Sequence, residues 1–337
     1  STNVQPASLV AGAQGNVTVS FTLATDLPNN GKILVVFPSG FNLAAVGPGD
    51  AFSPSLGALT VGVSGQTLTL TRTSGTLKSA GTVINDVTVA NVKNPVVSGS
   101  AGTYRIDTRT SGNAILDQDL AVAADTMTPG VLSAANVEPA QLSSSYVGNV
   151  TVSFTTANPI PADGKILITF GSGFAFNSGA ATAATSLTMN GSLSVGISSN
   201  TVTITRSAGA QQAAGEAETI TLSNVRNPQI SGSTGNYQIK TQNSADATID
   251  QDLAVAADTI TAGALSATNV EPVSLVAGAS GNVTVSLTTV NPIPLDGKIV
   301  VGFPSSFGFN SGGTTAATSA TMDGTFAVTV SGSTVTV

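Results

Sequence analysis

The sequence predicts an all-β protein made of tandem antiparallel β-sandwich domains, and three observations support this expectation. Apolar and polar residues alternate through short segments such as 16–23 and 67–71, which is the period of a strand with one buried face. Turn-forming residues such as Asn30-Gly31 separate these segments. The whole pattern then returns along the chain, which is typical of a repeat protein.

The strands of the first copy are short and closely spaced. In the segment 16–23, Val17, Val19 and Phe21 alternate with polar residues, as they would on a half-buried strand. Seven or eight short strands in roughly 130 residues are typical of an antiparallel sandwich. Further strands are expected at 32–37, 59–63, 83–92, 103–108 and 115–122.

The repeat has a period of 133 residues. The motif Asn-Val-Thr-Val-Ser begins at Asn16, Asn149 and Asn282, at equal intervals of 133 residues. The later copies are close relatives, because 149–179 and 282–312 are identical at 22 of 31 positions. Such close copies indicate that the number of units matters, since a single active site needs no duplicate.

Three domains follow from this period: a β-sandwich repeat at 1–133, a second at 134–266 and a partial third at 267–337. Short linkers are expected at 123–135 and 256–268. The third copy stops within a strand of the pattern, so it would expose unpaired edges and half a core. We expect further sequence, or less favourably a strand from another subunit, to complete it. The first residue is not Met, so a processed or partial chain is expected.

The composition limits the partners of the chain. Charged residues make up 9% of the chain, the net charge is −7, and the eleven basic residues are scattered. Because nucleic acids and anionic membranes attract clusters of basic residues, neither is an expected partner. The longest apolar runs, such as 33–37, have only the length of a strand, so no membrane span is expected in this segment.

The sequence contains neither cysteine nor histidine. The absence of Cys excludes disulfides, thiol nucleophiles and zinc–thiolate sites. The absence of His removes the commonest general base and the commonest transition-metal ligand. No phosphate-binding glycine loop and no Gly-x-Ser-x-Gly motif is present either. We therefore assign no catalytic residue and expect that the protein is not an enzyme.

The candidate metal sites are acidic and lie at the expected junctions between copies. Residues two apart in a strand share a face and lie roughly 7 Å apart, and calcium prefers several hard oxygen ligands. The pattern predicts calcium ligands at Asp117, Asp119, Asp125 and Glu138, and again at Asp250, Asp252, Asp258 and Glu271. The alternative is a solvated strand edge followed by a polar linker. This alternative is favoured, because the spacing of an EF-hand loop is absent. No other cofactor is expected.

Four Asn-x-Ser/Thr sequons are candidate glycosylation sites. They begin at Asn16, Asn149, Asn282 and Asn190. The first three lie on the polar side of their strands, so attachment of a glycan is sterically feasible in a host that N-glycosylates. Asn-Val-Thr is equally an ordinary strand sequence in a Thr-rich protein, and its recurrence accompanies the duplication.

Two other recurring features have a plain structural interpretation. Lys32, Lys165 and Lys298 follow an Asn-Gly or Asp-Gly turn, which favours an exposed Lys at a strand start over an isopeptide bond to Asn91 or Asn224. Most aromatic residues lie in 37–41, 170–176 and 303–309. We expect these Phe side chains to belong to the core, rather than to an exposed sugar-binding platform.

The repeated short-strand pattern resembles the immunoglobulin-like superfold of bacterial adhesins, cadherin-like stalks and microbial surface fibres. The Cys…Trp…Cys hallmark of antibody domains is absent, since the chain has neither residue. The acidic junctions resemble the calcium-stiffened linkers of cadherin-like arrays, although the cadherin linker motif itself is missing.

The resemblance implies tandem immunoglobulin-like domains in an extracellular or cell-surface protein. The leading expectation is a structural subunit of a filament, sheath or stalk, whose partners are copies of itself. The alternative is the repeat stalk of an adhesin that displays a binding domain outside this sequence. A third and weaker alternative is a spacer array within a large extracellular enzyme.

Overall fold

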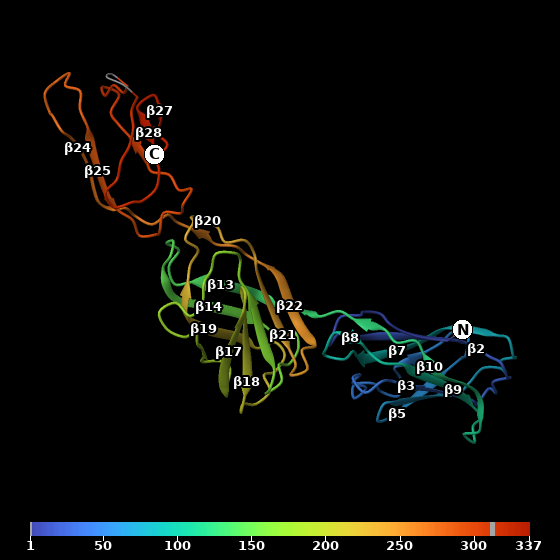
Figure 1. Cartoon of the computed structure of the whole chain (residues 1–337). Helices are drawn as coiled ribbons and strands as arrows, with labels where there is room; N and C mark the ends of the chain where they lie inside the picture. The colour runs from blue at the N-terminus through green and yellow to red at the C-terminus, as the bar shows by residue number, and fades with distance from the viewer. Residues whose placement is uncertain (1, 311–313) are drawn as a thin grey trace. The chain divides into compact units, whose positions relative to one another are not determined.

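The computed structural model describes residues 2–310 and 314–337 (Figure 1). The described residues contain no helix, and their sheets are almost entirely antiparallel, so the all-β prediction is confirmed. The chain divides into two compact units. The first consists of Ser1–Gln141, Val147–Arg226 and Ser233–Thr259, and the second of Leu142–Tyr146, Asn227–Gly232 and Ile260–Val337. The first unit thus holds nearly all of repeats 1 and 2.

Repeat 1 is a sandwich of two antiparallel sheets. One sheet has the order β1 (Asn3–Pro6), β2 (Gln14–Thr22), β7 (Val83–Lys93) and β4 (Ala51–Phe52). The other has the order β10 (Ile115–Val122), β9 (Tyr104–Arg109), β3 (Lys32–Val36), β6 (Thr67–Arg72) and β5 (Leu59–Ser64). A small extra pair joins β11 (Thr126–Met127) to β8 (Gly99–Ser100). Each of the longer expected strands is therefore confirmed within one or two residues.

The apolar residues of the two sheets form one hydrophobic core. Val17 and Val19 of β2, together with Leu68 and Leu70 of β6, are at most 1% exposed and belong to the same cluster of buried residues. Because their neighbours along each strand are polar, each sheet has one buried and one wet face. Burial of one such side chain contributes about 1.5–3 kcal/mol.

The expected role of the aromatic segments is confirmed in this core. Phe37 and Phe41 are 2% and 3% exposed, and both rings pack against the ring of Tyr104. The ring centroids of Phe37 and Tyr104 lie 5.5 Å apart in an edge-on arrangement, which aromatic pairs favour. In repeat 2, Phe170 and Tyr237 form the equivalent edge-on pair.

The strand order agrees in part with the immunoglobulin pattern. The order β1-β2-β7-β4 corresponds to the A-B-E-D sheet of that fold, and β10-β9-β3 corresponds to G-F-C. The hairpin of β5 and β6 is added beyond β3, and β4 precedes this hairpin in the chain. The order of the added strands therefore departs from that of a variable-type domain.

Repeat 2 has the same two-sheet arrangement. One sheet has the order β13 (Ser133–Pro139), β14 (Val147–Thr155), β19 (Ala217–Arg226) and β16 (Ala184–Ser186). The other has the order β12 (Gly130–Val131), β22 (Thr248–Val255), β21 (Tyr237–Gln242), β15 (Lys165–Thr169), β18 (Thr201–Ser207) and β17 (Ser192–Ser198). Two short strands, β20 (Gly232–Ser233) and β23 (Thr259–Ile260), occupy the positions of β8 and β11.

Along the chain, the change from the core of repeat 1 to the core of repeat 2 falls slightly before the expected boundary at residue 133. Met127 belongs to the core of repeat 1, whereas Leu132 belongs to that of repeat 2. The expected linker at 123–135 is largely strand, because β11 pairs with repeat 1 and β12 pairs in parallel with β22 of repeat 2. The edges of both sandwiches thereby satisfy the backbone hydrogen-bonding groups of this segment.

The region of the third copy has much less of a core. It contains β24 (Ser266–Pro272), β25 (Val283–Thr288), β26 (Val300–Gly302), β27 (Thr329–Ser331) and β28 (Thr334–Thr336). Val270 and Val285 are 43% and 39% exposed, whereas the equivalent Val137 and Val152 of repeat 2 are fully buried. In repeat 2 the sheet of these valines continues through β19, and the facing sheet includes β21 and β22; none of these three strands has a counterpart among the described residues of the third copy.

A fully buried arginine ties together the loops at one end of each complete sandwich. Arg72 is 1% exposed and donates hydrogen bonds to four main-chain carbonyl oxygens, those of Leu27, Pro28, Leu56 and Thr76, at 2.6–3.2 Å. The guanidinium suits this position because its donors form a rigid planar fork. In repeat 2, Arg206 is equally buried and bonds to the carbonyls of Ile160, Pro161, Asn190 and Ala210.

We predict that Arg72→Ala lowers the free energy of unfolding by about 3 kcal/mol, because it leaves four buried or partly buried carbonyl groups without their donor. Arg72→Lys should be nearly as harmful, since one ammonium cannot span the same four acceptors. Urea denaturation followed by circular dichroism measures both changes. The control is Lys240→Ala on the outer face of β21, which should stay within about 0.5 kcal/mol. A loss below 1 kcal/mol for Arg72→Ala would contradict this role.

Candidate functional site

One end of repeat 1 carries a short loop, residues 10–12, which we call the joining loop. Its backbone is held by two hydrogen bonds, from Ala11 N to the Thr128 carbonyl and from Gly12 N to the Pro95 carbonyl, both 2.8 Å long. Gly12 has a φ of +69°, in the left-handed region that glycine enters without strain. The loop therefore has a fixed shape on the surface of the sandwich.

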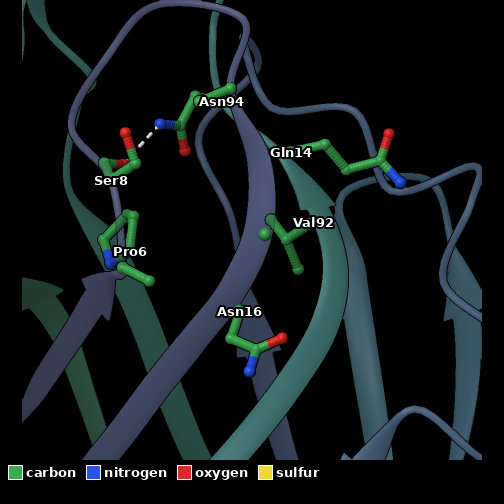
Figure 2. A pocket seen from close by; sticks show the side chains of 9 residues that line it. Pro6, Ser8, Gln14, Asn16, Val92 and Asn94 are labelled. Atoms are coloured by element: carbon green, nitrogen blue, oxygen red, sulfur yellow. Dashed lines mark hydrogen bonds between the residues drawn. The ribbon is translucent and has the colours of Figure 1, made fainter.

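An Asn-Pro pair that recurs one period later, as Asn94-Pro95 and Asn227-Pro228, supports this loop. The Asn94 amide donates to the carbonyls of Ser8 and Val10 at 2.7 and 3.0 Å, and the first bond is visible in Figure 2. Asn94 itself is 3% exposed. In repeat 2 the equivalent Asn227 donates to the carbonyl of Ser143 at 3.0 Å. The recurrence of Asn-Pro at this spacing thus reflects support of the joining loop.

A small hollow lies beside the joining loop. Figure 2 shows its wall, to which β1, β2 and β7 contribute side chains. Its volume is about 150 Å³, well below the 300–1,000 Å³ typical of ligand pockets. Its lining residues are Pro6, Ala7, Ser8, Ala13, Gln14, Gly15, Asn16, Val92 and Asn94.

Repeat 2 presents a carboxylate toward this loop. Asp250 of β22 is fully buried, and its Oδ2 accepts hydrogen bonds from the backbone amides of Ala157 and Asn158 at 3.0 and 2.9 Å. We call Asp250 and the backbone of 157–158 the receiving corner. A carboxylate that accepts two successive amides holds the turn rigidly and stays hydrogen bonded in a buried place.

The Asn158 side chain joins the two repeats. Its Nδ2 donates to Asp250 Oδ1 at 2.7 Å and also to the carbonyl of Ala11 in the joining loop at 3.1 Å. Asn158 is 2% exposed and Ala11 is 3% exposed. Both protons of this amide are therefore used, one within repeat 2 and one across to repeat 1.

Two glycines make this close approach possible. A Cβ on Gly12 would overlap Asn158 Oδ1, and a Cβ on Gly130 would overlap Asp250 Oδ1. Gly130 is also the residue of β12 that pairs with Asp250 of β22. Glycine is required at these two positions because a buried side-chain oxygen lies where a Cβ would be.

The second unit contains a related contact. There, Asn291 Nδ2 donates to Ser144 Oγ at 2.8 Å. Asn291 is one period after Asn158, and Ser144 is one period after Ala11. The loop of Ser144 is held as in repeat 1, by hydrogen bonds from Ser144 N to the Thr261 carbonyl and from Ser145 N to the Pro228 carbonyl. In each unit, therefore, an asparagine amide donates a hydrogen bond to the equivalent loop, at Ala11 in the first unit and at Ser144 in the second.

The structure brings few of the eight expected calcium ligands together. Asp117 binds the amides of Ala24 and Thr25, while Asp119 and Asp252 accept the amides of Ala121 and Ala254. Glu138 and Glu271 are exposed. No group of three or more acidic side chains suited to a metal is present among the residues that the structure describes. Calcium binding at the junctions stays a prediction.

Asp125 and Asp258 each serve a buried tyrosine. Tyr104 and Tyr237 donate their hydroxyl protons to these carboxylates at 2.7 and 2.8 Å. Burial raises the pKa of Tyr237 well above its ordinary value, and the bond to Asp258 raises it further. Burial also raises the pKa of Asp258, and the nearby negative charge of Glu138 adds to this shift. Glu138 and Asp258 are thus one pair of the expected set that does interact.

The other candidate residues lie at the surface. Asn16, Asn149, Asn190 and Asn282 are all exposed, so glycosylation at these positions stays a prediction. Lys32 Nζ donates to Asn113 Oδ1 at 2.7 Å, and Lys165 pairs with Asp246 at the equivalent place. These contacts tie neighbouring hairpins on the surface.

Sequence reasoning missed the residues that form the junction itself. It marked Asp250 as a candidate metal ligand but did not identify it as the carboxylate that holds Asn158. Asn158, Gly12 and Gly130 were not recognised. The sequence signal that could have identified Asn158 was its Asn-Pro-Ile-Pro motif, which recurs one period later at Asn291.

The fold and this junction define the class of the protein as a tandem array of β-sandwich repeats. No protein-family model and no curated protein matches the sequence. Among solved structures, the chain is similar to the "AgI/II polypeptide BspA C terminal domain" of Streptococcus agalactiae. The match has 9% identity, covers 78% of this chain and 99% of that chain, and has a TM-score of 0.29.

A second similar structure is a "Putative membrane anchored protein from Corynebacterium diphtheriae". It has 11% identity, covers 78% of this chain and 91% of that chain, and has a TM-score of 0.26. Neither likeness is close enough to assign a function. Within the described part of the chain, no helix has the length and apolar character needed to cross a bilayer.

We predict that substitutions at Gly12 and Asn158 have strongly non-additive effects on the free energy of unfolding. Gly12→Ala should lower the free energy of unfolding of the first unit by about 2–4 kcal/mol, because the added Cβ overlaps Asn158 and adopts a left-handed φ. In the double variant with Asn158→Ala the overlap disappears, so the two losses should fall short of additivity by at least about 1 kcal/mol.

The control for this double-mutant cycle of Gly12 and Asn158 is Gly81→Ala. Gly81 has a φ of +82°, and nothing lies within 4 Å of its Cβ position, so this variant measures the backbone strain alone, about 1–2 kcal/mol. Urea denaturation of the full chain supplies all the values. Additive losses at Gly12 and Asn158 would show that the two residues are not in contact.

We also predict that calcium has little effect on stability. The carboxylates proposed as ligands are dispersed, and several already accept backbone amides or tyrosine hydroxyls. Addition of 2 mM calcium or of EDTA should therefore shift the Tm by less than about 1 °C, since a ligand stabilises only the state that binds it. A rise of several degrees with calcium, reversed by EDTA, would instead support calcium binding at the junctions.

Proposed function

We propose that this chain is a non-enzymatic structural segment, in which β-sandwich repeats act as rigid units of an extracellular filament, sheath or surface stalk. The observation that carries the proposal is the junction of repeats 1 and 2. There a buried carboxylate, an asparagine amide and two glycines form a fitted contact. Such a contact restricts bending between neighbouring repeats, as a spacer requires.

The chemistry of the chain supports a structural role over a catalytic one. Cysteine and histidine are absent, which removes the most common nucleophile–base pairs. The two hollows found on repeat 1 have volumes of only about 150 and 130 Å³. Low charge also allows similar surfaces to pack side by side with little electrostatic repulsion.

The same junction suits a stalk that displays an adhesive domain located elsewhere in a longer polypeptide. The two functions differ in the partner of the repeats. A filament or sheath subunit contacts copies of itself, whereas a stalk unit contacts only its neighbours along the chain. An extracellular or cell-surface location is part of the proposal in both cases.

Immunogold labelling of intact producing cells tests this proposal. Antibodies against repeat 2 should label filaments, a sheath or surface projections. In-frame deletion of residues 134–266 removes one period and should shorten the labelled structure by the length of one repeat. The control strain carries Lys240→Ala and should be unchanged. Label confined to the cell interior, or a structure unaffected by the deletion, would overturn the proposed function.

A further inference from the structure

We propose that β17 of repeat 2 is a lateral docking edge, which pairs antiparallel with β17 of a second copy of this chain about a two-fold axis. The inference rests on the proposed structural function and deepens it, because it states how copies would be joined side by side. Three observations carry it: an edge strand without protection, an outward amide whose equivalent in repeat 1 has a main-chain partner, and a strand sequence that matches its own reverse.

The strand β17 ends the larger sheet of repeat 2, which has the order β12-β22-β21-β15-β18-β17. Its seven residues, Ser192–Ser198, pair with β18 without a register shift. The junction with repeat 1 includes the other edge of this sheet, where Gly130 of β12 pairs with Asp250 of β22. The outer side of β17 is therefore separate from the contact between the two repeats.

The other edge strands of repeat 2 have features that hinder pairing with a further strand. β13 contains Glu138 and Pro139 and has a register shift against β14, while β12 and β16 are only two and three residues long. Charge, proline, bulges and short length all protect the edges of sheets. β17 contains neither a charged residue nor a proline. A regular, uncharged edge of this length is suited to receive another strand.

The main-chain amide of Val195 points outward from this edge. Val195 is equivalent to Val61 of β5, since each lies opposite a residue two positions before the buried arginine of its repeat. In repeat 1 the Val61 N–H donates to the Pro48 carbonyl at 3.0 Å, on the side away from β6. Leu193 and Ile197 have the same orientation as Val195, because every second residue of an antiparallel strand turns its main-chain groups to the same side. Among the described residues, no main-chain group bonds to these three on the outer side.

The burial of the two equivalent edges differs accordingly. Leu59 and Val61 of β5 are buried, where the loop of Pro48 bonds to the strand. The equivalent Leu193 and Val195 of β17 are only half-buried, although they pack against the core of repeat 2. A strand placed beside β17 would therefore satisfy the outward main-chain groups and cover these apolar side chains at once.

The sequence of β17 favours a second copy of itself as this strand. It reads Ser-Leu-Ser-Val-Gly-Ile-Ser, which has nearly the same residue types in reverse. Antiparallel pairing with Val195 opposite Val195 of the other copy places Leu193 opposite Ile197, and Ser194 opposite Gly196. The three outward residues of each copy then form hydrogen-bonded pairs with about six main-chain bonds.

The side chains agree with this register on both faces. On the core side, aliphatic side chains lie opposite aliphatic ones, which stabilises a cross-strand pair. On the other side, Ser and Gly lie opposite each other, so neither bulk nor like charge separates the copies. The same patch serves on both copies, and the contact is therefore isologous. It continues the larger sheet of repeat 2 from one chain into the next.

Sedimentation velocity over a concentration series of the full chain tests the affinity. Gly196→Lys should weaken self-association at least roughly 10-fold, because it brings two like charges together across the two-fold axis. The matched control is Gly62→Lys at the equivalent position of β5, where the Cβ position is equally open. This control should associate as the unsubstituted chain does. Equal effects of the two substitutions would overturn the inference. So would an unsubstituted chain that stays monomeric, which would leave the edge to a strand of a different protein.

A charge pair tests the register and guards against a simple failure to fold. Ser194 lies opposite Gly196 of the other copy in the proposed pairing. Chains carrying Ser194→Glu mixed with chains carrying Gly196→Lys should therefore form heterodimers at least roughly 5-fold tighter than either homodimer. The control mixture contains Gly62→Lys in place of Gly196→Lys and should show a smaller gain. The same gain in both mixtures would contradict the register.

Cross-linking tests the contact directly, because the natural chain contains no cysteine. Chains carrying Ser194→Cys are mixed with isotope-labelled chains carrying Gly196→Cys and are then oxidised. These positions form a non-hydrogen-bonded pair with Cα atoms about 4.5 Å apart, within the range of a disulfide. We expect heterodimers well above the level obtained when the partner chain carries Gly62→Cys. Equal heterodimer yields with the two partners would refute the pairing.

The two proposals fail in distinguishable ways. If cross-linking gives no preference but antibodies still label a surface structure that shortens on deletion, the inference is wrong and the proposed function stands as a stalk. If the label is confined to the cell interior, the proposed function fails. In that case specific heterodimers would still support the edge as a mode of self-association.

Discussion

The structure depends on a carboxylate that accepts two successive backbone amides at one end of each complete repeat. Asp250 holds the amides of Ala157 and Asn158, and Asp117 holds those of Ala24 and Thr25. In repeat 2 this bond orients the Asn158 amide toward the joining loop of repeat 1. A charged acceptor in a buried place must be fully hydrogen bonded, so the turn, the asparagine and the incoming loop are constrained together.

The hydrophobic core of each sandwich holds the carboxylate turn and the joining loop at opposite ends of the repeat. The alternating apolar residues of two sheets form one core, and a buried arginine gathers the loops at the rim. The repeat is therefore a stiff body whose two ends are complementary. This explains why repeats 1 and 2 need no flexible linker between them, and why residues 126–127 and 130–131 form strands on either side of the boundary.

Much of the fold could be predicted from the sequence. The strands, the aromatic core around Phe37 and the period of 133 residues depend on local alternation and on self-similarity, and both are visible in a single chain. The functional residues were harder to find. Asp117 and Asp250 stood out as acidic, but their spacing pointed to a metal, because a sequence does not reveal which backbone amides a carboxylate will meet. Asn158 and Gly12 carry no signal apart from their place in the repeat.

By itself, the sequence determined that this protein is a β-sandwich array without thiol or imidazole chemistry, because side-chain period and residue content are local properties. Only the tertiary structure decided which groups meet at the junction, since Asn158 and Ala11 are 147 residues apart in the chain. It also decided that Asp117 holds the amides of Ala24 and Thr25 as Asp250 holds those of Ala157 and Asn158. Such matches depend on folded surfaces, and these exist only after the two sheets have packed.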